Sequence, residues 1–196
     1  MIFKILALSF AILNTLITNP ELIIGEEKVN PGIVFIFEGA VKDQIFPKSM
    51  HLDENQTNVH IEARVNWDNK NIPEGTPEGG FIPFLYITTT IINQSSGYKT
   101  FVDLKPHINL IDNFHYARNI ALPGPINGLY TVRFNITPPT EIVLAIHRDW
   151  FNKYGEKLLS NYVFAVSYTH LRAHEPVRYL VCRLLLEKKK GGGGGG

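Results

Sequence analysis

Short β-type segments separated by turn-forming residues constrain the fold of this 196-residue chain more than any other feature. The segments are rich in β-branched and aromatic residues, whereas Gly, Pro and Asn gather between them. No stretch shows the apolar period of an amphipathic helix. We therefore predict an all-β fold, a β-sandwich of about seven to nine antiparallel strands. The predicted strands cover residues 33–41, 57–65, 81–93, 98–104, 128–137, 141–147 and 161–165.

The segment TNVHIEARV, residues 57–65, holds the first candidate for chemistry. Its residues alternate between apolar and polar, and His60 and Glu62 stand two positions apart, so both point to the same face of a strand. An imidazole and a carboxylate held side by side on a rigid strand can act as two metal ligands. An isolated H-x-E pair also fits an ordinary polar strand face. Evidence from the rest of the chain is needed to choose between a metal site and a polar face.

The N-terminal residues have the pattern of an export signal. Lys4 precedes an apolar run of about 13 residues, which is too short for a comfortable membrane span. We assign residues 1–22 to a signal peptide or to an uncleaved N-terminal anchor, because no clear small-residue cleavage site follows. This assignment predicts a periplasmic domain that does not itself insert into the membrane.

Residues 166–196 resemble translated sequencing adapter. Three lysines and six glycines at the end are what poly-A and then poly-G would encode, and VSYTHLRAHE and LVCRLLLE back-translate to adapter-like DNA. We exclude this segment from functional reasoning and place the metal-binding domain at residues 23–165. The excluded segment contains Cys182, the single cysteine, and carries six basic and two acidic residues, so the remainder has a net charge of about −3. No basic footprint for nucleic acid remains.

The other candidate ligands are histidines. Neutral imidazole is the commonest metal-binding side chain and suits copper, zinc and iron, while a carboxylate adds a harder oxygen ligand. Taken singly, a histidine at a strand end is more often a surface or capping residue, and the wide spacing here matches no local metal signature. Outside the excluded segment the chain has five: His51, His60, His107, His115 and His147.

Five sequence blocks follow one another over roughly residues 30–165: NVHIEARV, GGFIPFLYITTTIIN with SGYK, DNFHYARNI, GLYTVRFNITPP and AIHRDW. In this order they resemble the periplasmic Fe²⁺ transport protein family. The most specific parts are H-x-E-A, G-x-IP-x-L and HY-x-x-NI. This family includes copper- and iron-binding proteins of iron uptake and a related spirochaetal membrane-antigen lipoprotein. Its last strand, F-x-VSY, also matches residues 164–168.

The resemblance implies an immunoglobulin-like sandwich that forms a homodimer and binds copper, with iron or manganese nearby. It also implies a role beside an inner-membrane iron permease. His60 and Glu62 match the H-x-E ligands of the family, and His115 matches the histidine of its HY motif. His147 matches the histidine before Arg after the Pro-Pro turn, and Asp112 matches an acidic position linked to the second metal.

His107 departs from the family pattern, which has a methionine ligand after a proline. Here Pro106 is followed by His107, so we interpret the imidazole as a replacement for the thioether. Sulfur favours soft Cu(I), whereas imidazole and carboxylate favour Cu(II), Zn²⁺ or Fe²⁺, so we expect weaker Cu(I) binding than is usual in the family. Met50 is an alternative source of sulfur. The segment from His107 to His115 is expected to form a bend that closes over the metal.

The sequence therefore predicts an exported protein that binds copper and iron, with zinc or manganese as possible substitutes in vitro. We predict a binding protein and not an enzyme, because the part before residue 166 has no cysteine and no G-x-S-x-G motif. A copper chaperone or buffer without a link to iron is one alternative. An adhesion sandwich with incidental histidines is the other.

Overall fold

The computed structural model describes residues 21–171, in which eight antiparallel strands form one nearly closed sheet. The all-β prediction is confirmed, and the number of strands lies in the expected range. The strands are β1 (Leu22–Val29), β2 (Ile33–Ala40), β3 (Val59–Trp67), β4 (Tyr86–Asn93), β5 (Lys99–Asn109), β6 (Asn113–Ile120), β7 (Tyr130–Thr137) and β8 (Tyr162–Thr169). The helical elements are the 3₁₀ turns η1 (Lys48–Met50) and η2 (Glu54–Gln56) and the helix α1 (Arg148–Tyr154).

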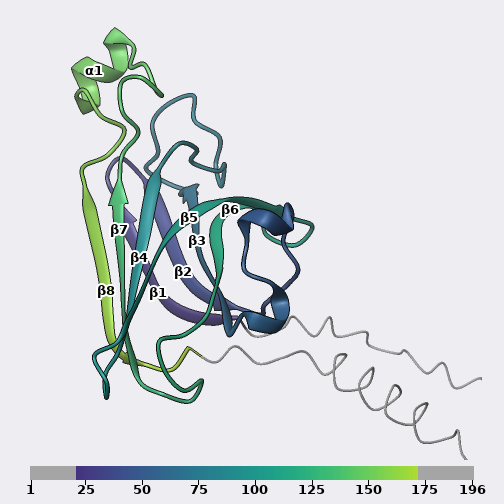
Figure 1. Cartoon of the computed structure of the whole chain (residues 1–196). Coiled ribbons are helices and arrows are strands. Elements are labelled where there is room, and N and C mark those ends of the chain that lie inside the picture. Colours follow the sequence, from purple (N-terminus) through teal and green to yellow (C-terminus); the bar gives the residue numbers. More distant parts are fainter. Residues whose placement is uncertain (1–20, 172–196) are drawn as a thin grey trace, which may run out of the picture.

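Strand β5 connects two layers of the sheet. The strand order is β1-β2-β3-β6-β5-β4-β7-β8. The first half of β5 pairs with β4, and its second half pairs with β6. In Figure 1 the layer of β1, β2 and β3 lies behind the layer of β4, β7 and β8. The edge strands meet where Gly25 of β1 packs on the ring of Phe164, so closely that a Cβ at this position would clash.

Aromatic side chains fill the space between the two layers. Phe37 of β2 stacks on Phe134 of β7 and on Phe164 of β8, with ring centroids 4.3 and 4.6 Å apart. Burying one such side chain contributes about 1.5–3 kcal/mol relative to exposure. The inward side chains of β3 are equally buried, which fixes the register of that strand and therefore the direction of its polar face.

Tyr116 of β6 fixes the segment before β4. Its hydroxyl donates to the carbonyl of Ile82 at 2.9 Å and accepts from the backbone N–H of Leu85 at 3.0 Å. Burial raises the pKa of Tyr116 to about 12. The predicted strand 81–93 therefore begins later than expected, at Tyr86, because this side chain takes two backbone groups of the segment before it.

Three local predictions are wrong. Residues 105–122, predicted as a bend, continue β5 and form β6, joined by a turn at 110–112. Residues 141–147, predicted as a strand or strand edge, form a turn and the segment that leads into α1, which Gly155 ends with a φ of +90°. Residues 26–32, predicted as a linker, contain the end of β1, an edge strand whose outer side chains are polar.

The two ends of the chain bear on the predicted boundaries. Strand β8 continues past residue 165 to Thr169 and pairs with β7 there. This agrees with the resemblance of residues 164–168 to the family's last strand. The adapter origin of residues 166–196 stays a prediction. Residues 1–20 and 172–196 lie outside the described residues, and so does most of the predicted export signal. Within residues 21–171, no helix is long and apolar enough to span a bilayer.

Candidate metal centre

The candidate metal centre lies on the outer face of the layer that contains β3, β5 and β6. Alternation along β3 sends its apolar side chains into the core and places His60 and Glu62 on the opposite face. The strand register sets His60 of β3 opposite Asn119 of β6, and His107 of β5 opposite His115 of β6. Three neighbouring strands therefore bring these polar side chains together.

The connection between β2 and β3, residues 41–58, covers this face. In Figure 1 it is the blue segment with two short helical turns beside β6. Asn119 holds the connection in place, because its amide nitrogen donates to the carbonyls of Asp43 at 2.8 Å and Leu52 at 3.1 Å. Thus His60 is only 6% exposed although it points away from the core. The cover comes from residues 41–58 and not from the expected bend at 107–115, which is part of the sheet.

Three imidazoles and one carboxylate converge under this cover. His60, His107 and His115 each offer a ring nitrogen, and these nitrogens lie within 4.8 Å of one another. Glu62 Oε2 lies 3.5 Å from Nε2 of His115 and 3.9 Å from Nε2 of His60. The structure thus brings together four of the six side chains that we predicted as ligands, and their binding of a metal stays a prediction.

Hydrogen bonds to the Nδ1 atoms leave Nε2 free in two of these imidazoles. Asn119 Oδ1 lies 2.8 Å from Nδ1 of His60, and Nδ1 must donate because the amide nitrogen of Asn119 serves two carbonyls. Nδ1 of His115 lies 3.0 Å from the carbonyl oxygen of Asn113, which can only accept. A histidine that donates from one nitrogen presents its other lone pair to a metal, and this is the usual arrangement in metal sites.

The remaining polar atoms of the centre have no hydrogen-bond partner in the described part of the chain. Both ring nitrogens of His107 and Oε1 of Glu62 are buried and unpaired. Leaving one buried polar group unsatisfied costs about 1–3 kcal/mol, so native structures hold few of them. A metal ion bound to these atoms would remove the penalty, and the donor set of imidazole and carboxylate suits copper, zinc or iron.

Burial keeps the metal-free centre uncharged at neutral pH. Removal from water lowers the pKa of His60 to about 4 and that of His107 to about 3, and it lowers the pKa of His115 as well. Burial, reinforced by neighbouring carboxylates, raises the pKa of Glu62 to about 8. The contacts of Glu62 with His60 and His115 are therefore not ion pairs. Because the imidazoles are already neutral, they do not have to lose a proton before they bind a metal.

The raised pKa of Glu62 leads us to predict that metal binding releases a proton. At pH 7 its carboxyl is mostly protonated because its pKa is about 8, and a bound metal would displace that proton, whereas the neutral imidazoles release none. We expect release of close to one proton per metal at pH 7 and an affinity that rises with pH up to about 8. Titration calorimetry in buffers of different ionisation enthalpy measures the release. Glu62→Gln should abolish it, and an unchanged release in that variant would contradict the assignment.

A group of carboxylates adjoins the imidazoles and shares Glu62 with them. Ligand oxygens of Glu21, Glu38 and Glu62 lie within 4.8 Å of one another. Arg64 forms a two-point ion pair with Glu38, in which its Nε and Nη2 donate to the two carboxylate oxygens at 2.6 and 2.7 Å. Asp112, another predicted ligand, lies in the β5–β6 turn, and its charge helps to raise the pKa of Glu62. It lies near the carboxylate group without belonging to it.

His147 does not reach the centre of its own chain. It is the N-cap residue of α1 and lines an open depression with Arg148, Asp149 and Asn152. Figure 1 shows α1 at the far end of the molecule from the β5–β6 turn. The predicted convergence of His147 with the other ligands therefore fails within one chain, because the segment expected to be a strand turns outward into a helix.

Sequence reasoning missed two residues beside the centre. Asn119 belongs to the HY-x-x-NI motif, and that motif was the available signal. His51 was one of the five candidate histidines but was not assigned to the centre, because its place depends on the irregular 41–58 connection. The ring of His51 packs edge-on against His107, with centroids 5.1 Å apart. Met50, considered as a sulfur ligand, is 61% exposed and does not support that alternative.

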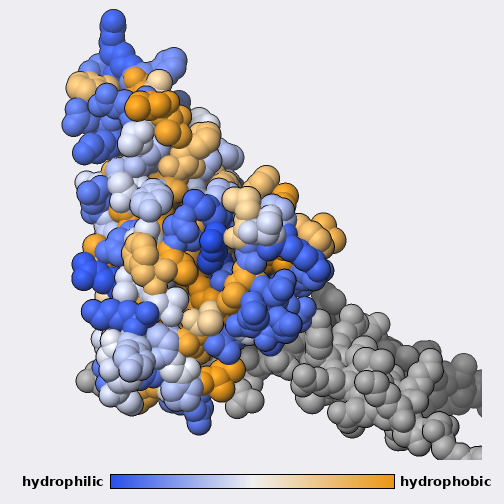
Figure 2. Space-filling model, viewed as in Figure 1, coloured by the Kyte–Doolittle hydropathy of each residue, from blue (hydrophilic) through white to orange (hydrophobic). Residues whose placement is uncertain are grey.

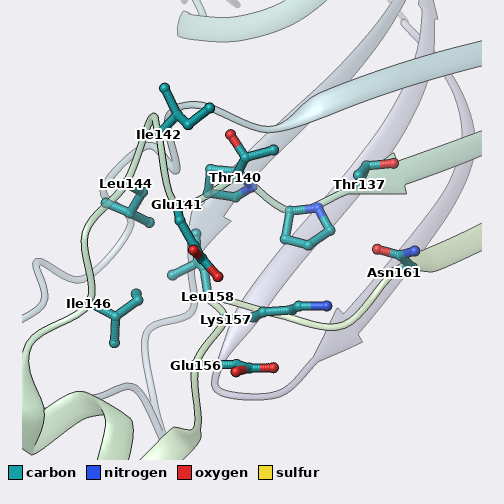
Figure 3. A pocket seen from close by; sticks show the side chains of 12 residues that line it. Thr137, Thr140, Glu141, Ile142, Leu144, Ile146, Glu156, Lys157, Leu158 and Asn161 are labelled. Atoms are coloured by element: carbon teal, nitrogen blue, oxygen red, sulfur yellow. The ribbon is translucent and has the colours of Figure 1, made fainter.

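The pocket in Figure 3 lies away from the imidazoles. The segment after β7 and the residues between α1 and β8 form its walls, with Glu141, Glu156 and Lys157 among the labelled side chains. No histidine lines it, so it adds nothing to the metal centre.

The family model described as "Fe2+ transport protein" matches residues 18–170. This chain belongs to that family. The match contains every element that builds the centre, from β2 to β6. No curated protein matches the sequence.

Solved structures of two other proteins share the fold. A copper-bound variant of FetP from uropathogenic Escherichia coli strain F11 is 22% identical, with a TM-score of 0.62 over 77% of this chain and 99% of that one. A copper-bound variant of P19 from Campylobacter jejuni is 24% identical, with a TM-score of 0.64 over 76% and 97%. Copper-reconstituted P19 gives 23% identity and a TM-score of 0.62 over 76% and 97%.

Proposed function

We propose that this chain is an exported copper- and iron-binding protein that assists iron uptake together with an inner-membrane iron permease. One observation carries the proposal: His60, His107 and His115 form a buried, uncharged group of imidazoles in a chain of the Fe²⁺ transport protein family. FetP and P19 have been obtained with copper bound, which supports copper as the metal of the imidazole group. In this proposal the centre binds and holds metal.

Iron fits the oxygen side of the same centre. Carboxylates are harder ligands than imidazoles, and Glu62 belongs to both groups of ligand atoms. Both carboxylate oxygens of Glu38 already accept from Arg64, so the main carboxylate ligands of an iron ion here would be Glu62 and Glu21. Zinc and manganese would compete at these ligands in vitro.

Export to the periplasm agrees with the predicted signal at residues 1–22. FetP was isolated after recombinant expression in the periplasm of E. coli. The only cysteine lies beyond the described residues, so the described domain needs no disulfide in an oxidising compartment.

The tip of the β5–β6 hairpin supports a homodimer as the working state. Leu110 and Ile111 are almost fully exposed, and Ile108 and Phe114 beside them are at least 46% exposed. Figure 2 shows hydrophobic surface where this turn projects from the body. An exposed apolar group of this kind marks an interaction surface, and a second copy of the chain would cover it.

Light scattering tests the dimer. We expect the mass of two chains for the unmutated protein and of one chain for the double substitution Leu110→Asp with Ile111→Asp. Ile142→Asp is a matched control, because Ile142 is equally exposed on another part of the surface. A monomeric unmutated protein at high concentration would overturn the dimer proposal.

Growth and uptake experiments test the role. We expect a strain that lacks the gene to grow poorly under iron limitation and to take up less radioactive iron, and the unmutated gene to restore both. The gene carrying His60→Ala should fail to restore them. Normal iron uptake combined with sensitivity to copper would instead support a copper chaperone or buffer. A purified, tag-free protein without any bound metal would support the adhesion alternative.

A further inference from the structure

We propose that His51, on the β2–β3 connection, is a fourth imidazole of the metal centre and makes it a thioether-free site for Cu(II) or Zn²⁺. This inference rests on the proposed function, because it requires the neighbouring imidazoles to bind a metal. His51 lies beside the only predicted ligand that departs from the family pattern, His107.

The spacing of the rings around His107 fits imidazoles that share one ion. Imidazole nitrogens bind Zn²⁺ at about 2.0–2.1 Å, which places the ring centroids of two ligands on one tetrahedral metal about 5 Å apart. The centroids of His51 and His107 are 5.1 Å apart, and those of His60 and His107 are 5.3 Å apart. The pairs with His115 are wider, at 5.9 Å from His107 and 6.2 Å from His60. His51 lies beside His107 and outside the group of three imidazoles whose nitrogens already lie within 4.8 Å of one another.

An unsatisfied nitrogen points to the same role. Nδ1 of His51 is buried and has no hydrogen-bond partner in the described residues, as is true of both nitrogens of His107. Two adjacent imidazoles with three buried, unpaired nitrogens between them are costly in a protein without metal. A shared ion would satisfy one nitrogen of each ring.

Asn119 couples the position of His51 to that of a strand ligand. It accepts from Nδ1 of His60 through Oδ1 and donates to the carbonyl of Leu52, the residue after His51. The same amide thus orients one imidazole and fixes the backbone that carries the other. The covering connection is therefore placed to supply a ligand as well as to exclude water.

The ligand set determines which oxidation state is favoured. Four imidazoles contain no soft sulfur, so they favour Cu(II) and Zn²⁺ over Cu(I). His51→Met should shift the preference back toward Cu(I), because it adds a thioether where the connection can reach the metal.

The test compares tag-free full-length protein with His51→Ala and with a control, His170→Ala, which removes an exposed histidine that belongs to no group of candidate ligands in the described residues. We expect His51→Ala to lower Cu(II) affinity about 10-fold or more in competition with a chelator, and to change the nitrogen hyperfine pattern of the Cu(II) resonance spectrum. The control should match the unmutated protein. Equal affinity and equal spectra for His51→Ala and the unmutated protein would overturn this inference alone. A protein that binds no copper at all would overturn the proposed function with it.

Chemical modification gives a second readout that needs no variant. Copper should protect His51 from acylation by diethylpyrocarbonate in the unmutated protein, as measured by peptide mass spectrometry. The exposed His170 serves as the internal reference and should react equally with and without copper. Modification of His51 that copper does not slow would contradict the proposal.

Discussion

His60→Ala is expected to lower the copper affinity of the chain by at least about 100-fold, or about 2.7 kcal/mol of binding free energy. The imidazole lies at the middle of the ligand group, and its free Nε2 faces both His115 and Glu62. Loss of this ligand also frees Asn119, which orients the ring and holds the covering connection. Competition with a chelator of known affinity measures the change.

The matched control for His60→Ala is His170→Ala, which should leave the affinity unchanged because His170 is exposed and belongs to no group of candidate ligands in the described residues. Circular dichroism of the metal-free proteins establishes that both variants fold. If the two variants lost affinity equally, the centre formed by β3, β5 and β6 would not be the copper site of one chain.

Arg64→Ala is expected to give the largest loss of stability among the polar residues near the centre. Glu38 is only 1% exposed, and Arg64 donates to both of its carboxylate oxygens. Removing one partner of a buried ion pair costs about 3–5 kcal/mol, and we expect a value toward the lower end because the Arg64 side chain is 30% exposed. Urea unfolding of the metal-free protein measures the loss against a typical total of about 5–15 kcal/mol.

Two further variants show whether the loss of stability in Arg64→Ala comes from the buried ion pair. Adding Glu38→Gln to Arg64→Ala should recover part of the lost stability, because it removes the unpaired buried charge. Lys28→Ala breaks the exposed pair of Lys28 with Asp68 and should change stability little. A loss for Arg64→Ala no larger than that for Lys28→Ala would show that the buried pair does not stabilise the fold.

The sequence predicted the strand-borne part of the centre well. His60 and Glu62 share a face because side chains alternate along a strand, and this local rule is independent of the rest of the fold. His115 was placed through the HY motif, and His107 through its position after Pro106. The register between β5 and β6 then sets His107 directly opposite His115. Spacing alone could not show this pairing, because the segment between them was predicted as a bend.

The parts that were wrong or missed depend on contacts distant in sequence. His147 follows a segment with apolar residues typical of a strand, but α1 begins at Arg148 and carries it outward. His51 lies in an irregular connection whose path is fixed by Asn119, a residue 68 positions later in the sequence. The high pKa of Glu62 likewise follows from burial under that connection, which no local pattern reveals.

The position of the metal tests the central claim most directly. Crystals of the copper-loaded protein, measured at the copper absorption edge, give an anomalous difference map that locates the ion without reference to any ligand assignment. We predict one strong peak per chain within coordination distance of Nε2 of His60 and Nε2 of His115, under the 41–58 connection. A copper peak at His147 or elsewhere on the surface, with none between these two nitrogens, would contradict the account.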